Sequence, residues 1–554
     1  MLLKVCMTKK KIEKEPFPKG KIIGGRAMID YLMTQYGSPT AHPLSKESFF
    51  IVAPGLLAGT TAPQSGRLSV GGKSPLTGGI KEANSGGTAA HKLARVGIRG
   101  IMVQGRASEW QILKIGAKEV SFEKAEEIVG LKNYAACEKL QQRYGDHIGI
   151  IITGPAGEMK LANSTVAVTD LEGRPCRHCA RGGVGALMGA KGLKAIVIED
   201  SEGSVREAQD KNAFKEAVKE AVKVIQSIPW VGSFHEFGTP LLVDVDNAQG
   251  SLPTNNHRLG AFEQFQDING ERMVELNRIR GGSMGHACMP WCVVRCSPVF
   301  HDPSGKFLTA ALEYETLASL GSNLGIADMD SIARMDRQCD DLGIDTIEMG
   351  CTIGVLNDVG LFRFGDAVGA ERLIDEIGKG TPMGRILGSG VVNAAKVFGI
   401  DRIPAVKGQG IPAHTARSRK GWGVTYATSP QGADHTAGVV HDGTSPIGQV
   451  EKSRNAQIAY AGIDAAGLCM FTFLADKPEV IVPMINALYG VNWTVSDYHE
   501  MAKEMLRLER AFNIKAGISP KADRLPDWMR TEPLPPTNAV FDVPQEEIEE
   551  IFNF

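Results

Sequence analysis

The order of the predicted elements constrains this chain more than any other feature. Up to about residue 203, short runs rich in β-branched residues alternate with turns of Gly, Ser and Thr, a pattern typical of strands. Beyond that point, apolar residues recur at helical spacing. Strands followed by helices, rather than alternating with them, predict an α+β fold with a β-rich N-terminal part and a mainly α-helical remainder.

The individual elements follow from local patterns. Predicted strands are Leu2–Met7, Phe49–Ala53, Gly100–Gln104, Trp110–Ile115, Ile150–Thr153 and Ala195–Glu199. Predicted helices are Ala208–Ile228, which Pro229 would end, Glu313–Leu324, Asp328–Leu342, Thr346–Val359, Gly369–Gly378, Met383–Phe398, Asn455–Leu474, Pro478–Leu488 and Ser496–Ala516. The proline-rich tail from Pro520 is predicted to be extended and to end in a short acidic helix.

Composition excludes some classes of function. A net charge of −2 gives no support for nucleic-acid or membrane binding. No apolar run is long enough to span a membrane and no secretory signal is visible, so we expect a cytoplasmic, thiol-reducing setting. Glycine is abundant, at 64 of 554 residues, against a usual share of about 7%. This excess indicates either loops around a large ligand or a turn-rich β domain.

A cluster of three cysteines is the strongest chemical signal. Cys288, Cys292 and Cys296 are spaced C-x3-C-x3-C, and an iron–sulfur cluster needs four soft anionic ligands. On a helix these positions would span roughly 12 Å, so the segment is predicted to form a turn, which Pro290 favours. Cys469 is the candidate fourth ligand. Buried structural cysteines and a zinc site are the alternatives.

Two glycine-rich segments could cradle phosphate. Residues 181–192 nearly match G-x-G-x-x-G, but Met188 breaks the pattern, no Walker motif is present, and residues 174–180 do not look like the strand that a Rossmann loop follows. The other segment spans residues 65–87, where Arg67 suits a phosphate. Ordinary β turns are the alternative for both segments. Cys176-x-x-Cys179, beside the first loop, is read as a structural pair.

Many short motifs in a fixed order resemble the aldehyde:ferredoxin oxidoreductase family of tungsten–pterin enzymes, over almost the whole chain. The motifs are Ser65-Gly-Arg67, Lys73-Ser-Pro-Leu-Thr-Gly-Gly79, Asn84-Ser-Gly-Gly87, Gly154-Pro-Ala-Gly-Glu158, Arg181-Gly-Gly-Val-Gly-Ala186, Lys191-Gly-Leu-Lys-Ala195, the cysteine cluster, Glu313-Tyr-Glu-Thr316, Asp340-x-x-Gly-x-Asp345, Tyr426-Ala-Thr428, Gly432-Ala-Asp-His435 and Asp464-x-x-Gly-Leu-Cys469.

The resemblance implies three domains: a β-rich cofactor base (1–203), a helical domain with the cysteine cluster (204–405) and a helical domain with the catalytic His and the fourth cysteine (406–554). It implies tungsten, or molybdenum, held by two pterins, with Mg²⁺ at their phosphates and a nearby [4Fe–4S] cluster. It also implies ferredoxin or a similar Fe–S carrier as electron partner, a small-molecule substrate, and a homodimer or a complex with electron-transfer subunits.

The resemblance also assigns roles to residues. Carboxylates can accept paired hydrogen bonds from a pterin edge. By the resemblance, the residues that bind the pterins and their phosphates would be Asp340, Ile344, Asp345, Asp464, Leu468, Arg67, Asn84, Ser85, Gly86, Arg181, Gly182 and Gly183. Its cluster ligands would be Cys288, Cys292, Cys296 and Cys469. Helix-end or turn carboxylates are the alternative for each Asp.

Catalysis would need a base and an acid near the metal. Glu315 would deprotonate water and His435 would donate to the carbonyl oxygen, with Glu313 as the competing carboxylate. His414 stands where relatives often carry Tyr, and the first two cluster cysteines are separated by three residues where the family usually has two.

The resemblance implies an enzyme that oxidises an aldehyde to a carboxylic acid and reduces ferredoxin. Its alternatives are a low-potential two-electron reaction on a non-aldehyde substrate with the same cofactor, and a pterin-free Fe–S electron-transfer protein. A nicotinamide dehydrogenase is a weaker candidate, because the glycine loop is imperfect.

Overall fold

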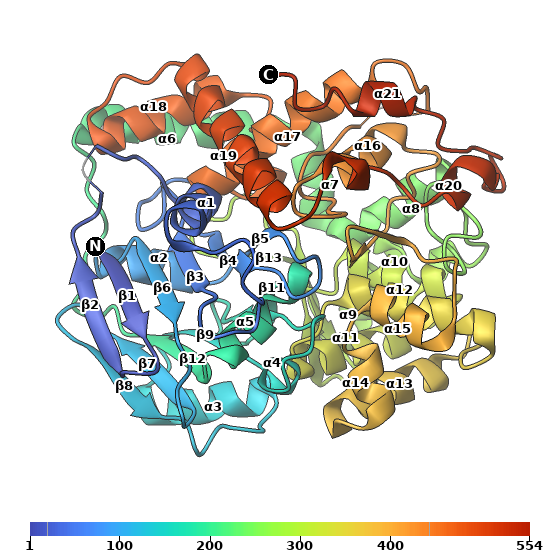
Figure 1. Ribbon diagram of the computed structural model, residues 1–554, viewed down its shortest axis with the longest axis horizontal. Coiled ribbons are helices and arrows are strands. Elements are labelled where there is room, and N and C mark those ends of the chain that lie inside the picture. Colours follow the sequence, from blue (N-terminus) through green and yellow to red (C-terminus); the bar gives the residue numbers. More distant parts are fainter. Residues whose placement is uncertain (19, 442–443) are drawn as a thin grey trace.

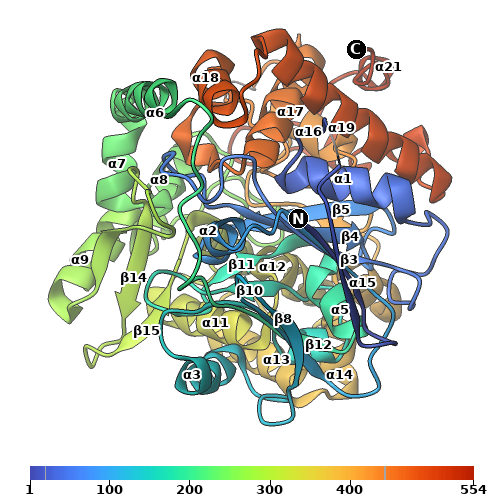
Figure 2. The ribbon, with the colours of Figure 1, turned by 90° about the vertical axis from the view of Figure 1, so that its left-hand side faces the viewer.

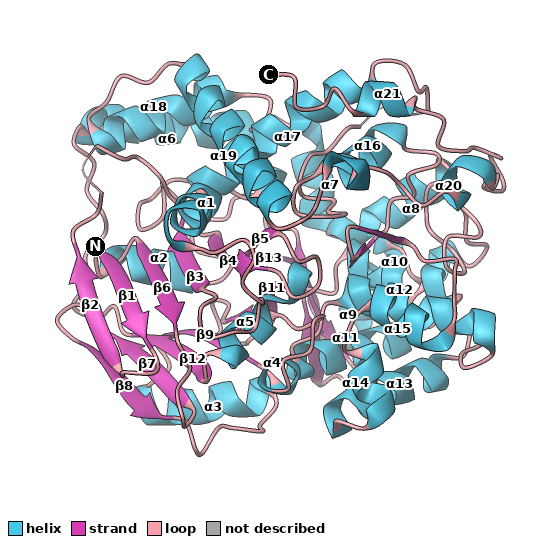
Figure 3. Cartoon of the chain, viewed as in Figure 1, coloured by secondary structure: helices cyan, strands magenta, loops and turns pink. Residues whose placement is uncertain are grey.

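The computed structural model describes residues 1–18, 20–441 and 444–554. Within these residues, two six-stranded mixed sheets form the N-terminal part and helices dominate the rest (Figures 1 and 3). The predicted α+β class, a β-sheet N-terminal part followed by a mainly helical region, is confirmed.

The first sheet has the order β2 (Lys11–Glu15), β1 (Leu2–Cys6), β6 (Gly100–Gln104), β3 (Phe50–Pro54), β4 (Leu68–Lys73) and β5 (Ile80–Ser85). The second has the order β11 (Arg177–Cys179), β10 (Val166–Val168), β9 (Gly149–Thr153), β12 (Leu193–Ile198), β7 (Gln111–Ile115) and β8 (Val120–Lys124).

Side-chain alternation along the strands builds the layers of this base. Successive residues of a strand point to opposite faces, so Val52 joins the core between the two sheets while Ile51 packs on the outer face under helix α1 (Gly25–Tyr36). In the second sheet, Ile151 faces the shared core and Ile152 faces helix α3 (Asn133–Tyr144). Helices α2 (Ala89–Arg95) and α5 (Val184–Ala190) contact strands of both sheets, and α4 (Pro155–Glu158) packs against α5 (Figure 2).

Two glycine-rich segments contain strands that the sequence did not reveal. Residues 65–87 carry β4 and β5, and Gly71 is required inside β4 because a Cβ there would lie 2.3 Å from the Lys81 carbonyl oxygen. The expectation that residues 174–180 lack a strand is wrong, because β11 occupies Arg177–Cys179. Glycine adds no side chain to the alternation that identifies a strand, so residues 65–87 look like a loop in the sequence. Residues 174–180 contain no glycine, but β11 is only three residues long and follows Pro175, so no alternating pattern reveals it.

Helices build the remainder of the described molecule around two small sheets, one of three strands and one of two. The strands are β13 (Ser283–His286), β14 (Ser297–His301), β15 (Phe307–Ala310), β16 (Ala405–Val406) and β17 (Gln409–Gly410). The helices are α6 (Lys211–Gln226), α7 (Pro229–Phe237), α8 (Leu242–Ala248), α9 (Gly270–Arg280), α10 (Tyr314–Leu320), α11 (Met329–Leu342), α12 (Thr346–Val355), α13 (Ala367–Lys379), α14 (Pro382–Leu387), α15 (Val391–Phe398), α16 (Lys420–Thr428), α17 (Gln449–Ala466), α18 (Pro478–Tyr489), α19 (Val495–Lys515), α20 (Trp528–Thr531) and α21 (Gln545–Ile548).

Most predicted helices are present, but three need correction. The helix predicted over Glu313–Leu324 ends at Leu320, and Gly321 separates it from a short 3-10 turn at Ser322–Leu324. Residues 383–398 form two helices, because Gly390 between them takes a φ of +90°. The helix predicted over 455–474 begins at Gln449 and ends at Ala466, where Gly467 adopts a left-handed φ of +75°. Pro229 ends the preceding helix as predicted and also starts α7, since proline suits a first helical position.

Separate hydrophobic cores hold the helical region together. Helices α10 to α14 share one large core, and α6, α7, α17 and α18 share another. The tail packs Phe541 and Val543 against α16 and ends with the acidic helix α21, as predicted. Of the residues that the structure describes, none forms a helix both long and apolar enough for a membrane span. The predicted domain limits at 203 and 405 stay predictions.

Candidate active site

A cavity of about 720 Å³ lies between the sheet base and the helical region. Its wall combines segments far apart in sequence: the end of β5, the turn before α5, helices α8, α10 and α11, and the stretch 431–441. Most of the predicted site residues reach this wall: Arg67, Asn84, Ser85, Gly86, Arg181, Asp340, Ile344, Asp345, Asp464, Glu315, His414, His435, Cys288, Cys296 and Cys469. Cys292, Gly182, Gly183 and Leu468 are not among the lining residues.

The cysteine segment forms a loop between β13 and β14, as its spacing predicts. Trp291 and Arg295 take left-handed φ values of +61° and +54° there, which lets the chain double back. A hydrogen bond from Cys292 lowers the pKa of the Cys288 thiol to about 6, and the nearby Arg177 and Arg67 act in the same direction.

Cys469 completes the group of four thiols. It follows α17 and its buried side chain lies close enough to Cys288 to feel that thiol's charge, as Cys296 also does. Burial raises the pKa of Cys469 to about 11. All four thiols are free of disulfides, so the structure brings together the four soft ligands that a cluster needs.

Asp340 and Asp464 occupy matching positions at the ends of two helices. Each lies three residues before a left-handed glycine, Gly343 at φ +73° and Gly467 at φ +75°, which ends α11 and α17 respectively. A carboxylate in the last turn of a helix opposes the helix dipole. Burial raises the pKa of both carboxyls by more than their basic partners lower it. Two acids held at such positions are best explained by a ligand that needs them.

Each of these aspartates has a basic partner from the sheet base. His178 Nε2 lies 3.0 Å from Asp340 Oδ1, and Arg26 donates to Asp464 Oδ2 at 3.2 Å. Asn84 donates to the other Asp464 oxygen at 3.1 Å. Among the described residues, Asp340 Oδ2 has no hydrogen-bond partner although it is buried. That oxygen is therefore available to accept a bond from a ligand in the cavity.

The glycine loop before α5 has its own packing reason. A Cβ at Gly182 would lie 2.5 Å from the Lys81 side chain, and one at Gly183 would lie 2.3 Å from a backbone oxygen. The loop thereby fixes the position of Arg181. The Arg181 guanidinium donates to Asp345 at 3.2 Å and to the Gly410 backbone oxygen at 2.6 Å. The close packing of the turn therefore requires these two glycines, whereas the Arg181 side chain lines the cavity.

Glu315 and Glu313, the two competing carboxylates, have different surroundings. Glu313 accepts hydrogen bonds from Ser297 at 2.8 Å and from Thr239 at 2.5 Å. Glu315 uses one oxygen, Oε2, to accept from the Ala413 N–H at 2.9 Å. Within the described chain its other oxygen, Oε1, has no hydrogen-bond partner. The geometry favours Glu315 as the carboxylate with a free basic atom.

Two imidazoles face the free oxygen of Glu315. His414 Nε2 lies 3.6 Å and His435 Nδ1 lies 3.8 Å from Oε1. Burial raises the pKa of Glu315 and lowers that of His435, so both groups favour their uncharged forms more than exposed side chains do. The three predicted catalytic residues are thus neighbours in space, although they come from separate parts of the chain.

Several residues of this site carried no signal in the sequence. Arg26, on α1, binds Glu509 through two hydrogen bonds of 2.8 Å as well as Asp464. Lys81 is fully buried and forms a 2.6 Å ion pair with Asp434. Only the pairing identifies them, because a buried charge requires a partner. Of their partners, the sequence motifs included Asp464 and also Asp434, which precedes His435 in Gly432-Ala-Asp-His435.

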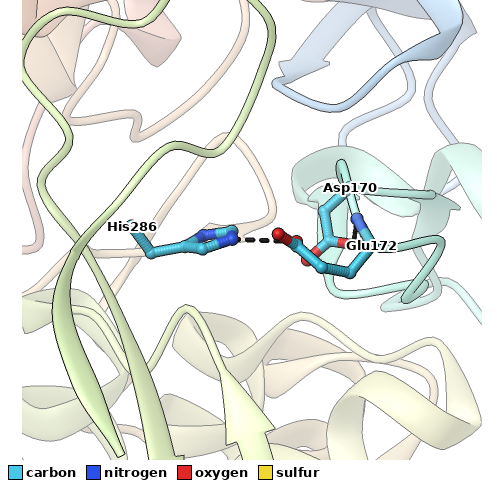
Figure 4. A group of neighbouring side chains, drawn as sticks. All are labelled: Asp170, Glu172 and His286. Carbon is cyan, nitrogen blue, oxygen red and sulfur yellow. Dashed lines mark hydrogen bonds and ion pairs between the residues drawn. The ribbon is translucent and has the colours of Figure 1, made fainter.

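Asp170, Glu172 and His286, next to the cysteine loop, are residue types that can bind a metal ion, but a positively charged side chain already binds the two carboxylates. His286 Nε2 lies 2.8 Å from Glu172, and Asp170 is a neighbour of both (Figure 4). However, the Arg174 guanidinium donates to Asp170 at 2.8 Å and to Glu172 at 2.7 Å. Arg174 thus pairs with both carboxylates, and Arg177 adds a second positive charge near Asp170. The group therefore connects residues 170–174 to the strand that precedes the cysteine loop.

The cavity, the four thiols and the paired aspartates define an oxidoreductase with a large redox cofactor, and comparison with known families gives the same class. Residues 2–200 match the aldehyde ferredoxin oxidoreductase N-terminal domain, and residues 216–553 match domains 2 and 3 of that enzyme. The chain belongs to the aldehyde ferredoxin oxidoreductase family.

Relatives in this family differ in what they act on. The chain is 34% identical to the tungsten-containing aldehyde ferredoxin oxidoreductase of Pyrococcus abyssi, over 96% of this chain and 92% of the relative. It is 26% identical to the aliphatic sulfonate oxidoreductase, WOR-like subunit, of Pyrococcus furiosus, over 93% and 86% of the two chains. A solved structure, the active site complex BamBC of benzoyl coenzyme A reductase, shares the fold with a TM-score of 0.82 and 18% identity over 99% of this chain and 92% of that one.

The residues present fit the tungsten group named for these relatives. Cys288, Cys296 and Cys469 line the cavity, and Cys292 lies beside Cys288 and Cys296. Asp340 Oδ2 and Glu82 Oε1 are buried acceptors without hydrogen-bond partners among the described residues. Arg67 and Arg181 supply cationic donors on the same wall. Soft ligands, free acceptors and guanidinium groups are the donor set that a cluster and an anionic pterin require.

Proposed function

We propose that this protein is a tungsten, or molybdenum, bis-pterin enzyme that oxidises an aldehyde to a carboxylic acid and passes the electrons to ferredoxin. One observation carries the proposal: Glu315 Oε1 is unbonded within the described chain and faces His414 and His435 inside the cavity that the aspartates and thiols also line. A general base must keep such a free oxygen for the proton that it removes.

The residues that would hold the cofactor divide between its two ends. Asp340 and Asp345 would bind one pterin and Asp464 the other. Arg67 would bind phosphate, and hard oxygen ligands near Asn84 would favour Mg²⁺. Cys288, Cys292, Cys296 and Cys469 would hold a [4Fe–4S] cluster. Cys469 follows Asp464 by five residues, which supports electron transfer between the pterin and the cluster.

Oxidation of an aldehyde by water yields a carboxylic acid, two protons and two electrons. When bound, the tungsten group would accept that electron pair, and the cluster would deliver the electrons singly to ferredoxin. Glu315 Oε1 would take the proton from water as its oxygen forms a bond with the aldehyde carbon. His435, whose Nδ1 lies 3.8 Å from Glu315 Oε1, would donate a hydrogen bond to the carbonyl oxygen of the aldehyde, where negative charge develops.

His414 is the observation that favours a second candidate, a low-potential reaction on a non-aldehyde substrate with the same cofactor. Its ring lies 3.6 Å from Glu315 and 2.9 Å from Asp246, so the site has an additional proton-carrying group. Acid production from a panel of aldehydes, with a viologen as electron acceptor, separates the two. Turnover of any aldehyde supports the first candidate, and turnover of none supports the second.

Elemental analysis tests the cofactor directly. Protein purified without oxygen from cells supplied with tungstate and molybdate is expected to hold about one tungsten or molybdenum atom and about four iron atoms per chain. Pterin extracted from the same sample should accompany the heavy metal. Iron without either heavy metal would identify a pterin-free electron carrier and would end the proposal.

The buried Glu315 predicts the direction of the pH dependence. Burial raises its pKa above the ordinary value of 4.5, and only the carboxylate form can accept a proton. Therefore kcat/KM for aldehyde oxidation should fall as the pH drops through this raised pKa. The rate–pH profile is the measurement. An acid limb at or below pH 4.5 would contradict the assignment of Glu315 as the base.

A further inference from the structure

Helix α8 places a buried carboxylate behind His414. Asp246 Oδ2 lies 2.9 Å from His414 Nδ1, and Asp246 is fully buried. Its other oxygen, Oδ1, forms an ion pair with Arg419 at 2.7 Å and accepts a hydrogen bond from the Ser251 hydroxyl. Neither the motifs nor the family resemblance pointed to Asp246, which lies 168 positions before His414 in the chain.

Two aromatic rings hold the imidazole of His414 in place. The Tyr314 ring stacks on it with the centroids 4.8 Å apart and the planes inclined by 25°. The Trp422 ring packs on it at 4.2 Å. With 4% of its surface exposed, the His414 side chain has no room to turn over. The two ring nitrogens therefore keep fixed neighbours, Asp246 at Nδ1 and Glu315 at Nε2.

The charges around this ring determine which nitrogen carries the proton. Burial alone would raise the pKa of Asp246, but His414 and Arg419 outweigh it and lower that pKa to about 2. The carboxylate beside Nδ1 is thus an anion throughout the neutral range, and an anion there favours hydrogen on Nδ1. The other ionisable groups around this ring include Glu315, His435, Arg419, Arg181, Tyr314 and Tyr426.

We propose that Asp246 is a positioning residue that holds His414 in the Nδ1–H form, so that bare Nε2 can accept the proton that Glu315 removes from water. The proposal rests on the proposed aldehyde oxidation. The O–H bond of protonated Glu315 breaks, an N–H bond forms at Nε2, and the charged imidazolium stays beside the Asp246 carboxylate. His414 then loses this proton to water that enters after the acid leaves, and Glu315 is an anion again for the next turnover.

A double-mutant cycle tests whether Asp246 acts through His414. Asp246→Asn is expected to lower kcat for aldehyde oxidation by about 10²-fold, with KM within about threefold of wild type. If its role runs through the imidazole, the Asp246→Asn/His414→Gln protein should be no slower than His414→Gln alone. Losses that multiply in the double variant would overturn the proposal, because a purely structural carboxylate would act independently of the ring.

The matched control is Asp244→Asn on the same helix. Asp244 accepts a hydrogen bond from Asn269 at 3.0 Å and does not line the cavity. This variant should keep wild-type kcat. A loss equal to that of Asp246→Asn would show that any neutralised acid on α8 disturbs the site, and would also overturn the proposal.

A second readout does not depend on turnover. Nitrogen-15 NMR of the histidine-labelled full-length protein distinguishes a protonated from a bare ring nitrogen, and His414→Gln assigns the signal by its disappearance. We expect Nδ1–H with bare Nε2 in the wild type, and hydrogen on Nε2 in part of the Asp246→Asn molecules. An unchanged ring signal in Asp246→Asn overturns the positioning role. Failure of the wild type to oxidise any aldehyde would instead refute the proposed reaction, while leaving this readout valid.

Discussion

Glu315→Gln is expected to lower kcat for aldehyde oxidation by about 10³-fold, the scale of a lost general base. The amide has nearly the same shape and can still accept the hydrogen bond from Ala413 that Glu315 Oε2 accepts at 2.9 Å. However, it cannot take a proton at the position of Oε1, the oxygen between His414 and His435. Steady-state kinetics with a viologen acceptor measure the loss, and metal analysis should show unchanged tungsten and iron.

Glu313→Gln is the matched comparison for this prediction. The hydroxyl groups of Ser297 and Thr239 donate to different oxygens of Glu313. In glutamine the amide oxygen can accept from one hydroxyl, and the amide NH₂ can donate to the oxygen of the other. We expect a loss of at most about tenfold. If Glu313→Gln abolishes turnover and Glu315→Gln retains it, the roles of the two carboxylates are reversed.

Asp464→Ala is expected to purify with less than about a tenth of the wild-type tungsten and pterin. The substitution removes a buried acceptor that Arg26 and Asn84 hold toward the cavity, and alanine offers a pterin nothing in its place. Because Arg26 keeps both bonds to Glu509, the fold should survive at a cost of about 1–3 kcal/mol.

Two measurements separate a lost cofactor from a lost fold. Metal analysis gives the tungsten content, and thermal unfolding gives the stability of the same preparation. Asp464→Asn keeps one acceptor oxygen and should retain more tungsten than Asp464→Ala. A full tungsten content in Asp464→Ala would show that this carboxylate does not hold the cofactor.

Local patterns predicted helices better than strands in this chain. The amphipathic helix α11 was predicted almost to its ends, since its capping Asp328 and terminal Gly343 are both visible in the sequence. Strand β5 was missed because it is a short, mostly polar run between two glycine pairs, and β4 was missed because Gly71 and Gly72 let neighbouring backbones approach closely. That requirement arises from the packing of the sheet and leaves no alternating pattern behind.

In the site, too, short local motifs could be recognised in the sequence, whereas contacts between distant parts of the chain could not. The spacing of the residues predicted the cysteine turn and showed the recurring Asp-x-x-Gly motif, because each is a short local pattern. The His435 motif and the pterin role of the aspartates came from the family resemblance and stay predictions. The sequence left open the choice between Glu315 and Glu313, which are two residues apart and identical in type. Their hydrogen-bond partners distinguish them, and those partners come from elsewhere in the chain.

By itself the sequence therefore determined the class of fold, the order of its elements and the residue types that could bind metal and pterin. Only the tertiary structure decided which buried charges pair: Arg26 with Asp464, Lys81 with Asp434, and Asp246 with His414. The partners in these three pairs lie 438, 353 and 168 positions apart in the chain, so no periodicity or spacing links them. They meet because burying one charge is unfavourable until packing brings an opposite charge beside it.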